Sequence, residues 1–436
     1  MTSVLPLDII ALIIDIVGER KDINLLKELA LVSHSFLQIC NKHLFATVDL
    51  FDAVSRRHVA SSKNGFVKLL TSRPDVVKYI RKLTYKVGAY HRFDSTLPAC
   101  PSFENDDHRL SPILPNFLRT IPRLNCLTII GSKSDWNTLD SSLTSAFLHL
   151  MHLPTVNHIN LSFIQSFPLS SLTPCVNLHR LDISCLRNFD RPDEDSPSEI
   201  VVQSEMMPKI REFHISGSAL LTRELLLAKR QDGQLAFNFT DLRRLSIYST
   251  WFDEQSTQYL LQNVKLLEKL HFSVGPKRSL VGLHNILSPC ARTLKVLDLT
   301  VSLYSVPPLL VGLCEGLEAM AGCNTLEDLS FEVQGYGHER EDFIGSIIQN
   351  VERVLVKPGW SALRHVSFKV SIASLSRVSR NNAKLSEALQ SLPDKYLSHL
   401  PKLESVAFKY SAYVVEYDFF ETSFDVFLSS SSPSTI

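Results

Sequence analysis

The chain has 436 residues, carries 45 basic and 45 acidic side chains, and is 44% hydrophobic. The length predicts more than one domain, and the hydrophobic fraction excludes a largely disordered chain. The balanced charge argues against nucleic acid or a membrane surface as the partner, because both attract a cationic face.

The sequence also bears on the compartment. Its 8 cysteines are spread along the chain without a C-x-x-C pair, which is typical of reduced thiols rather than of a disulfide framework. Asp8 stands where a signal peptide carries Lys or Arg. No apolar run reaches the roughly 20 residues that span a bilayer. We therefore expect a cytoplasmic or nuclear protein.

The first predicted helix covers residues 5–17 and is apolar on nearly every side. Only Pro6, Asp8 and Asp15 interrupt its aliphatic residues. A helix that faces a single core needs one apolar stripe, so this helix has to be covered on two sides. Because fully burying one Leu or Ile contributes roughly 1.5–3 kcal/mol, we expect it to contact the rest of the chain, another protein, or both.

A second helical stripe follows from Asp22 to Leu44. Its apolar residues recur at spacings of three and four: Leu25, Leu29, Val32, Phe36 and Ile39. We predict an all-α domain over residues 4–45, followed by a helical linker or N-terminal cap over residues 46–75.

Short motifs in this domain carry a resemblance to a known family. They are Leu5-Pro6, Ile9-Ile10, Ile13-Ile14, the string from Leu29 to Phe36, Cys40 and Leu44-Phe45. Together they resemble an F-box, in the F-box-like variant of fungal proteins that carry leucine-rich repeats. The resemblance implies binding to a Skp-type adaptor of a cullin–RING ubiquitin ligase. The adaptor-facing positions that it implies are Leu5, Pro6, Ile9, Ile10, Ile13, Leu31, Val32 and Phe36.

From residue 76 onward the pattern L-x-x-L-x-L recurs with conservative replacements. Its copies begin at Ile80, Leu124, Val156, Leu178, Ile210, Leu242, Leu267, Leu294, Leu326, Leu363 and Leu403. Alternate residues of a strand point to opposite faces, so the apolar positions point inward and the residues between them outward. The residue between the last two apolar positions is polar in every copy but the last: Thr84, Thr128, Asn160, Asp182, His214, Ser246, His271, Asp298, Ser330, Ser367 and Ala407.

Helical spacing of apolar residues separates several copies, over residues 220–227, 259–267, 308–320 and 343–355. The whole pattern resembles the leucine-rich repeat family over residues 76–412, with many gaps at or above its period of about 20–29 residues. It implies an α/β fold, a solenoid of short parallel strands alternating with helices. Residues 413–436 are predicted to form a C-terminal cap and a disordered Ser-rich tail, and Arg92–Ser111 and Arg187–Ser198 to form loops.

The outward, concave face of the strands is the candidate surface for a protein substrate, because it mixes both signs of charge. The candidate substrate-binding residues are Lys82, Asp182, His214, Arg244, Tyr248, His271, Asp298, Asp328, Glu332 and His365. An ordinary solvated sheet face has the same polar character, and that interpretation stays open.

The sequence predicts neither a metal site nor a cofactor. His149 and His152 lie three residues apart without further ligands near them, and His338 and Glu339 lack H-E-x-x-H spacing. No phosphate-binding loop, dinucleotide fingerprint or nucleophile elbow is present, so we expect no catalysis.

The leading hypothesis is therefore a non-catalytic substrate receptor of an SCF-type ligase. The alternative is a stand-alone repeat scaffold whose N-terminal helices only cap the solenoid. An enzyme with an unrecognised site is a third hypothesis.

Overall fold

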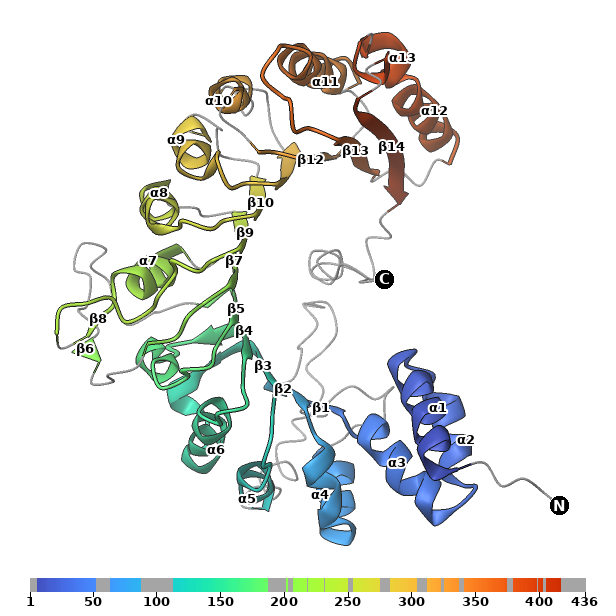
Figure 1. The fold of residues 1–436 in the computed structure, drawn as a ribbon, viewed down its shortest axis with the longest axis vertical. Helices are drawn as coiled ribbons and strands as arrows, with labels where there is room; N and C mark the ends of the chain where they lie inside the picture. Colours follow the sequence, from blue (N-terminus) through green and yellow to red (C-terminus); the bar gives the residue numbers. More distant parts are fainter. Residues whose placement is uncertain are drawn as a thin grey trace, which may run out of the picture. The chain divides into compact units, whose positions relative to one another are not determined.

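The computed structural model describes residues 6–51, 63–87, 113–186, 201–202, 207–217, 219–230, 232–249, 254–274, 283–303, 312–322, 325–336, 341–374, 379–397, 399–402 and 405–416. The chain divides into two compact units, residues 1–210 with 220–238 and residues 211–219 with 239–436. Each unit contains parallel strands with helices along one side (Figure 1). The predicted α/β architecture of parallel strands alternating with helices is therefore present.

The first unit begins with three helices: α1 (Leu7–Glu19), α2 (Ile23–Ala30) and α3 (His34–Leu44). The prediction of one helical stripe from Asp22 to Leu44 was wrong, because the helix breaks between Ala30 and His34. The Ser33 hydroxyl accepts the backbone N–H of Phe36 at 3.2 Å and so starts a new helix. Asp22 caps α2 in the same way, through the N–H of Leu25 at 3.1 Å.

The parallel strands of the first unit lie in the order β1-β2-β3-β4-β5. They are β1 (Thr47–Phe51), β2 (Lys82–Val87), β3 (Cys126–Asp135), β4 (His158–Gln165) and β5 (Arg180–Ser184). The connecting helices are α4 (Lys63–Ser72), α5 (Ile113–Arg119) and α6 (Ser141–Met151). Further along the chain, α7 (Ala219–Leu227) accompanies a small sheet of β6 (Val201–Val202) and β8 (Lys229–Arg230).

Strand β1 corrects the prediction that residues 46–75 form a helical linker. Asp49 on β1 is paired in register with Thr84 on β2, so the sheet starts one strand earlier than the repeat pattern suggested. The segment Thr47–Phe51 alternates in the manner of a strand, with Leu50 buried and Asp49 exposed. Among the described residues of this stretch, 46–51 and 63–75, helical structure is limited to α4 and the start of a short 3-10 turn at Pro74–Tyr79.

The second unit repeats the arrangement, with strand order β7-β9-β10-β11-β12-β13-β14. The strands are β7 (Glu212–Ser216), β9 (Arg244–Ser249), β10 (Lys269–Val274), β11 (Val296–Leu303), β12 (Asp328–Tyr336), β13 (His365–Ser374) and β14 (Ala407–Glu416). The helices are α8 (Glu254–Asn263), α9 (Leu283–Leu287), α10 (Leu313–Met320), α11 (Glu341–Leu355), α12 (Ser379–Gln390) and α13 (Leu392–Tyr396).

The register confirms the predicted polar row up to its last member. In the first unit Thr84, Thr128, Asn160 and Asp182 follow one another across the strands, and in the second unit His214, Ser246, His271, Asp298, Ser330 and Ser367 do so. At the C-terminal strand, Ser367 is paired with Lys409 instead of Ala407. The shift is two residues, which leaves every side chain on its predicted face.

The C-terminal boundary also differs from the prediction. Tyr413–Glu416 continue strand β14, so a separate cap does not begin at residue 413. Residues 417–436 and the two predicted loops, Arg92–Ser111 and Arg187–Ser198, lie outside the described residues.

Each unit buries the apolar positions of its strands beneath the helices. Examples from the strands are Leu127, Leu161, Leu181, Leu245, Leu297 and Phe331, all nearly inaccessible to solvent. In the described part of the chain, no helix combines the length and hydropathy that crossing a bilayer requires.

Candidate functional site

Helices α1, α2 and α3 form a small bundle with a core of its own. Ile14, Leu26 and Cys40 are buried at its centre, one from each helix. Partly buried side chains pack around them: Ile10, Val17, Leu29, Ala30, Phe36, Ile39 and Leu44. The bundle therefore uses one face of α1 for its own folding.

Polar contacts join α1 to α3. The Asp15 carboxylate lies 2.6 Å from Lys42 Nζ and 2.7 Å from His43 Nε2. The hydrogen bond from Lys42, followed by that from His43, lowers the pKa of Asp15 despite some loss of hydration. Gly18 allows this approach, because a Cβ at that position would collide with the His43 ring. Gly18 therefore lets the C-terminal end of α1 pack closely against α3.

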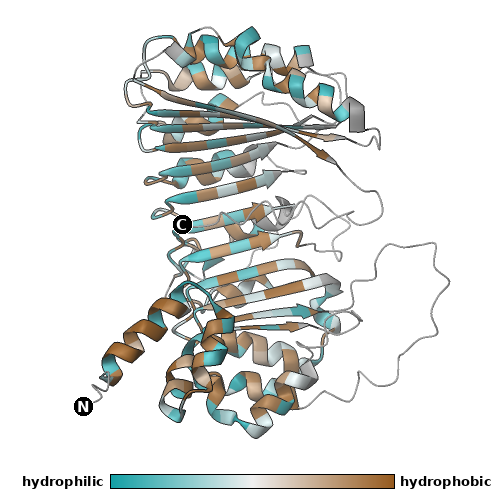
Figure 2. Ribbon diagram, turned by 90° about the vertical axis from the view of Figure 1, so that its right-hand side faces the viewer, coloured by the Kyte–Doolittle hydropathy of each residue, from teal (hydrophilic) through white to brown (hydrophobic). Residues whose placement is uncertain are grey.

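A second apolar face of α1 stays exposed. Ile9, Leu12, Ile13 and Ile16 recur at spacings of three and four along the helix, and all are exposed. Figure 2 shows α1 hydrophobic along most of its length. We call these four residues the outer face of α1.

The turn between α2 and α3 presents two more exposed aliphatic side chains. Leu31 is 87% exposed and Val32 is 65% exposed. The three-helix bundle therefore carries several large aliphatic side chains in water, and exposed apolar surface of this kind is typical of interaction sites.

The residues predicted to face an adaptor divide into two groups. Ile9, Ile13, Leu31 and Val32 are exposed, and so is Pro6, the N-cap residue of α1. Ile10 and Phe36 are partly buried and pack on the bundle core. Leu5 lies outside the described residues. The prediction missed Leu12 and Ile16, although their spacing from Ile9 places them on the same helix face.

In each unit the strands also present a polar face, opposite to the helices of that unit, and these faces are the second candidate surface. Its charges are arranged as ion pairs between neighbouring strands. Pairs directly opposite in register are Arg244–Glu212 at 3.1 Å, His365–Asp328 at 2.6 Å and Lys369–Glu332 at 3.0 Å. Lys269 reaches Asp298 diagonally, at 3.0 Å. Exposed ion pairs contribute about 0–1 kcal/mol each to the free energy of unfolding. Their main effect here is to neutralise opposite charges on neighbouring strands.

All of the predicted substrate-binding residues lie on strands of this polar face. Lys82, Arg244 and His365 are at least partly exposed, as are His214, Tyr248, Asp298, Asp328 and Glu332. The rings of Tyr248 and His271 lie 4.7 Å apart. Burial lowers the pKa of His271, and its Nε2 is buried without a partner among the described residues. Asp182 is nearly buried and serves the contacts described next.

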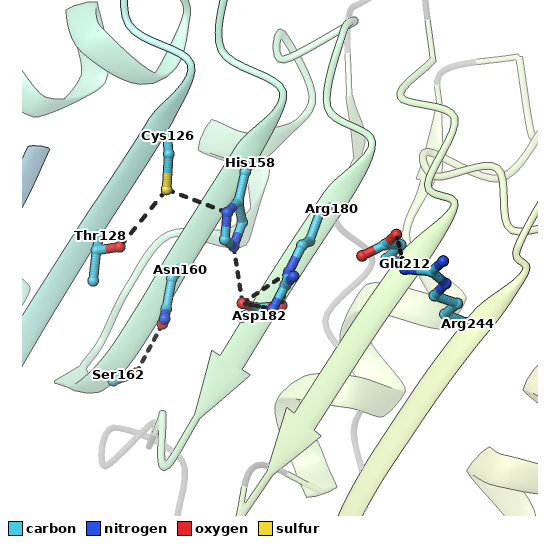
Figure 3. A network of polar contacts seen from close by, with 9 residues as sticks. All are labelled: Cys126, Thr128, His158, Asn160, Ser162, Arg180, Asp182, Glu212 and Arg244. Carbon is cyan, nitrogen blue, oxygen red and sulfur yellow. Dashed lines mark hydrogen bonds and ion pairs between the residues drawn. The ribbon is translucent and has the colours of Figure 1, made fainter. Parts of the chain in front are cut away.

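A chain of polar contacts crosses β3, β4 and β5 in the first unit (Figure 3). Cys126 Sγ lies 3.2 Å from His158 Nδ1, and His158 Nε2 lies 2.9 Å from Asp182 Oδ2. Arg180 Nε donates to both carboxylate oxygens of Asp182, at 3.1 and 3.2 Å. Sequence reasoning missed this cluster, although Cys126, His158 and Arg180 occupy equivalent positions of successive repeats.

The protonation of His158 reflects two opposing effects. Burial disfavours the charged ring, while the hydrogen bonds to Asp182 and Cys126 and the negative charge of Asp182 favour it. The contacts outweigh burial and raise the pKa of His158 to about 9.

The described residues contain no group of three or more side chains able to hold a metal ion. His149 is exposed, and His152 Nε2 lies 2.9 Å from the carbonyl oxygen of Ser171. His338 and Glu339 lie outside the described residues.

No protein-family model matches the chain, and no curated protein sequence matches it significantly.

Proposed function

We propose that the chain is a substrate-recognition subunit of an SCF-type cullin–RING ubiquitin ligase. Helices α1–α3 act as an F-box-like domain that binds a Skp-type adaptor, and the strand–helix repeats behind them bind the target protein. The chain itself performs no catalysis in this function. It holds target and ligase together and so raises their effective concentration.

The observation that carries the proposal is the doubly apolar helix α1. One face, with Ile10, Ile14 and Val17, packs in the bundle. The outer face stays exposed, and so do Leu31 and Val32. A bundle whose only task was to cap a solenoid would need one apolar face. The residues that the F-box resemblance assigns to the adaptor largely coincide with the exposed set.

The polar face of the strands supports the second half of the proposal. Its charges of both signs, already paired across strands, favour a protein surface over a polyanion as ligand. The same face carries the exposed side chain of Arg244 and the partly exposed ring of Tyr248, and both residue types are enriched at protein interfaces.

The test is co-purification with a Skp-type adaptor. The wild-type chain should retain the adaptor through gel filtration. Ile9→Asp and Leu31→Asp place a charge at the centre of the proposed interface and should each weaken binding by at least about tenfold, or about 1.4 kcal/mol. Both side chains point away from the bundle core, so the variants should fold.

Leu266→Asp is the matched control, because Leu266 is also an exposed aliphatic residue but lies in the second unit. It should bind the adaptor as the wild type does. A wild-type chain that fails to bind any Skp-type adaptor would contradict the proposal. Unfolding of Ile9→Asp and Leu31→Asp would instead favour the stand-alone scaffold, in which these helices serve only as a cap.

A further inference from the structure

We infer that strand β14 is a dimerisation edge, which pairs antiparallel with β14 of a second copy of this chain about a two-fold axis. The inference concerns the last strand of the second unit alone. It goes beyond the proposed ligase function and does not depend on it.

Strand β14 has a neighbour on one side only, within the residues that the structure describes. It is the last strand in the order of the second unit, and it pairs with β13 over its whole length, Ala407–Glu416, without a register shift (Figure 1). Its other edge therefore presents a row of backbone groups with no strand beside it. Such an edge is a template on which another strand can pair.

The register fixes which backbone groups point to this free edge. The N–H of Ala407 donates to the carbonyl oxygen of Arg364 at 2.7 Å, so Ala407 is bonded to β13. Residues bonded to one neighbour alternate along a strand with residues whose N–H and C=O point to the other side. The free edge is therefore lined by the backbone of every second residue, and we call these residues the inner row of β14: Phe408, Tyr410, Ala412 and Val414.

The side chains of the inner row leave the end of the hydrophobic core open. All of them are partly exposed, whereas their register partners on β13 are almost fully buried: Val366, Phe368, Val370 and Ile372. Helix α12 covers the inner row in part, and the Tyr410 hydroxyl donates to the carbonyl oxygen of Leu389 at 2.7 Å. A further strand beside β14 would bury these side chains more fully, because each repeat covers the apolar face of its neighbour.

The sequence of β14 lacks the features that usually protect an edge strand. Such edges are very short, or they carry a Pro, a bulge or an inward-pointing charge. Residues 407–416 contain no Pro, keep a regular register and place Lys409 on the polar face, with Glu416 at the last position. The edge strand of the first unit differs, because β1 spans only Thr47–Phe51 and exposes Asp49.

Strand β14 is complementary to itself in one antiparallel register. With Ser411 on the two-fold axis, Tyr410 stands opposite Ala412 and Phe408 stands opposite Val414, so that each larger side chain meets a smaller one. The inner rows of the two copies then form the hydrogen-bonded pairs of an antiparallel ladder. Both copies use the same surface, as a closed two-fold dimer requires.

Charge favours this register over its neighbours. With Ser411 on the axis, Lys409 stands opposite the uncharged Tyr413. An axis at Ala412 would place Glu416 opposite an apolar side chain of the inner row, and an axis at Lys409 would oppose two like charges.

The first experiment measures the mass of the intact chain by light scattering after gel filtration, at about 1–100 µM. The wild type should approach twice its 49.2 kDa as the concentration rises. Ala412→Pro removes an N–H that points to the free edge, not to β13, so it should weaken the dimer at least about tenfold without unfolding the strand. Circular dichroism checks that the variant is folded.

The matched control is Asp49→Pro, at the edge strand of the first unit. The N–H of Lys82 donates to the carbonyl oxygen of Ala46, so by the same alternation the N–H of Asp49 points away from β2. This variant should dimerise as the wild type does. Ile9→Asp should do so too, which separates the edge of β14 from association through the outer face of α1.

Two results of this experiment would overturn the inference. One is a wild-type chain that stays at 49.2 kDa at about 100 µM, including a chain that dimerises only after residues 417–436 are removed or that binds an extended peptide as a monomer. The other is a dimer that Ile9→Asp abolishes and a folded Ala412→Pro does not.

The second experiment tests the register by disulfide trapping. Residues on the axis form a non-hydrogen-bonded pair with Cα atoms about 4.5 Å apart, which a disulfide can bridge. Under mild oxidation, Ser411→Cys should give a covalent dimer at least about tenfold faster than the wild type or Tyr413→Cys. Combining Tyr413→Cys with Lys409→Cys should restore trapping, because these positions face each other. Equal trapping of Ser411→Cys and Tyr413→Cys would overturn the proposed pairing.

Discussion

At the residue scale, His158 has an environment that both opposes and favours its charge. Its side chain is 24% exposed, and burial alone would keep the ring neutral. The hydrogen bonds to Asp182, itself held by Arg180, and to Cys126 reverse this preference. Whether the pKa of His158 is raised or lowered depends on tertiary contacts between strands, so the sequence of a single repeat does not reveal it.

The stability of the first unit should therefore depend on pH through His158. The pKa is raised from 6.5 to about 9, so the stabilisation is complete below pH 6.5 and is lost as the pH rises through about 9. Between pH 6.5 and 9.5 the stability difference between wild type and His158→Gln should shrink by on the order of 2–4 kcal/mol. Urea denaturation at each pH measures this, and a difference independent of pH would contradict the assignment.

At the element scale, one buried carboxylate fixes helix α11 to the C-terminal end of the second unit. Glu352 is 4% exposed, and its Oε1 accepts the backbone N–H groups of His399 and Leu400, each at 2.8 Å. The two N–H groups stand at the start of a short 3-10 turn, Leu400–Lys402, and the first N–H groups of a helical turn have no acceptor within the turn itself.

Replacing this carboxylate should be costly. Glu352→Ala removes the acceptor of the buried Leu400 N–H and of the partly buried His399 N–H, and it should destabilise the second unit by about 2–3 kcal/mol. Glu352→Gln keeps an acceptor oxygen and should lose less. Glu318→Ala, on helix α10, removes only an exposed ion pair with Lys357 and should change stability little. Thermal unfolding of the three variants provides the measurement, and equal losses in all three would contradict this account.

At the scale of the whole molecule, stability is built from contacts between neighbouring repeats. Within each unit every long strand is paired with the strands next to it in the order, and helices contact the helices of adjacent repeats. Phe331 on β12 is almost fully buried, with its ring centroid 5.9 Å from that of Phe368 on β13. A defect in such an array should spread first to its neighbours.

Phe331→Ala tests this locality. Loss of a buried aromatic ring costs about 3–5 kcal/mol, so amide exchange should accelerate in β11, β12 and β13. Strands β3 and β4 of the first unit should keep their protection. Hydrogen exchange with mass spectrometry resolves these segments, and uniform loss of protection across both units would show that the chain unfolds as one cooperative body.

The repeat pattern predicted most of the strands, because a period-two alternation of apolar and polar residues has the same meaning in every copy. It missed β1, where Phe45 and Val48 stand at the two leading leucine positions of the pattern. It also misplaced the last strand by two residues. It also merged α2 and α3, because the apolar spacing continues through Leu31 and Val32 while Ser33 stops the helix by a local hydrogen bond. Propensity and spacing do not report such caps reliably.

The sequence by itself determined the parallel strand–helix repeats, the polar row on one face and the two apolar faces of α1, because periodicity alone assigns side chains to faces. Only the tertiary structure decided which face of α1 is used in the bundle, and that Ile10 and Phe36 pack inward while Leu12 and Ile16 stay exposed. It alone brought Cys126, His158 and Asp182 together across three strands. Contacts between residues more than twenty positions apart depend on strand register and helix packing, and neither is encoded in a local pattern.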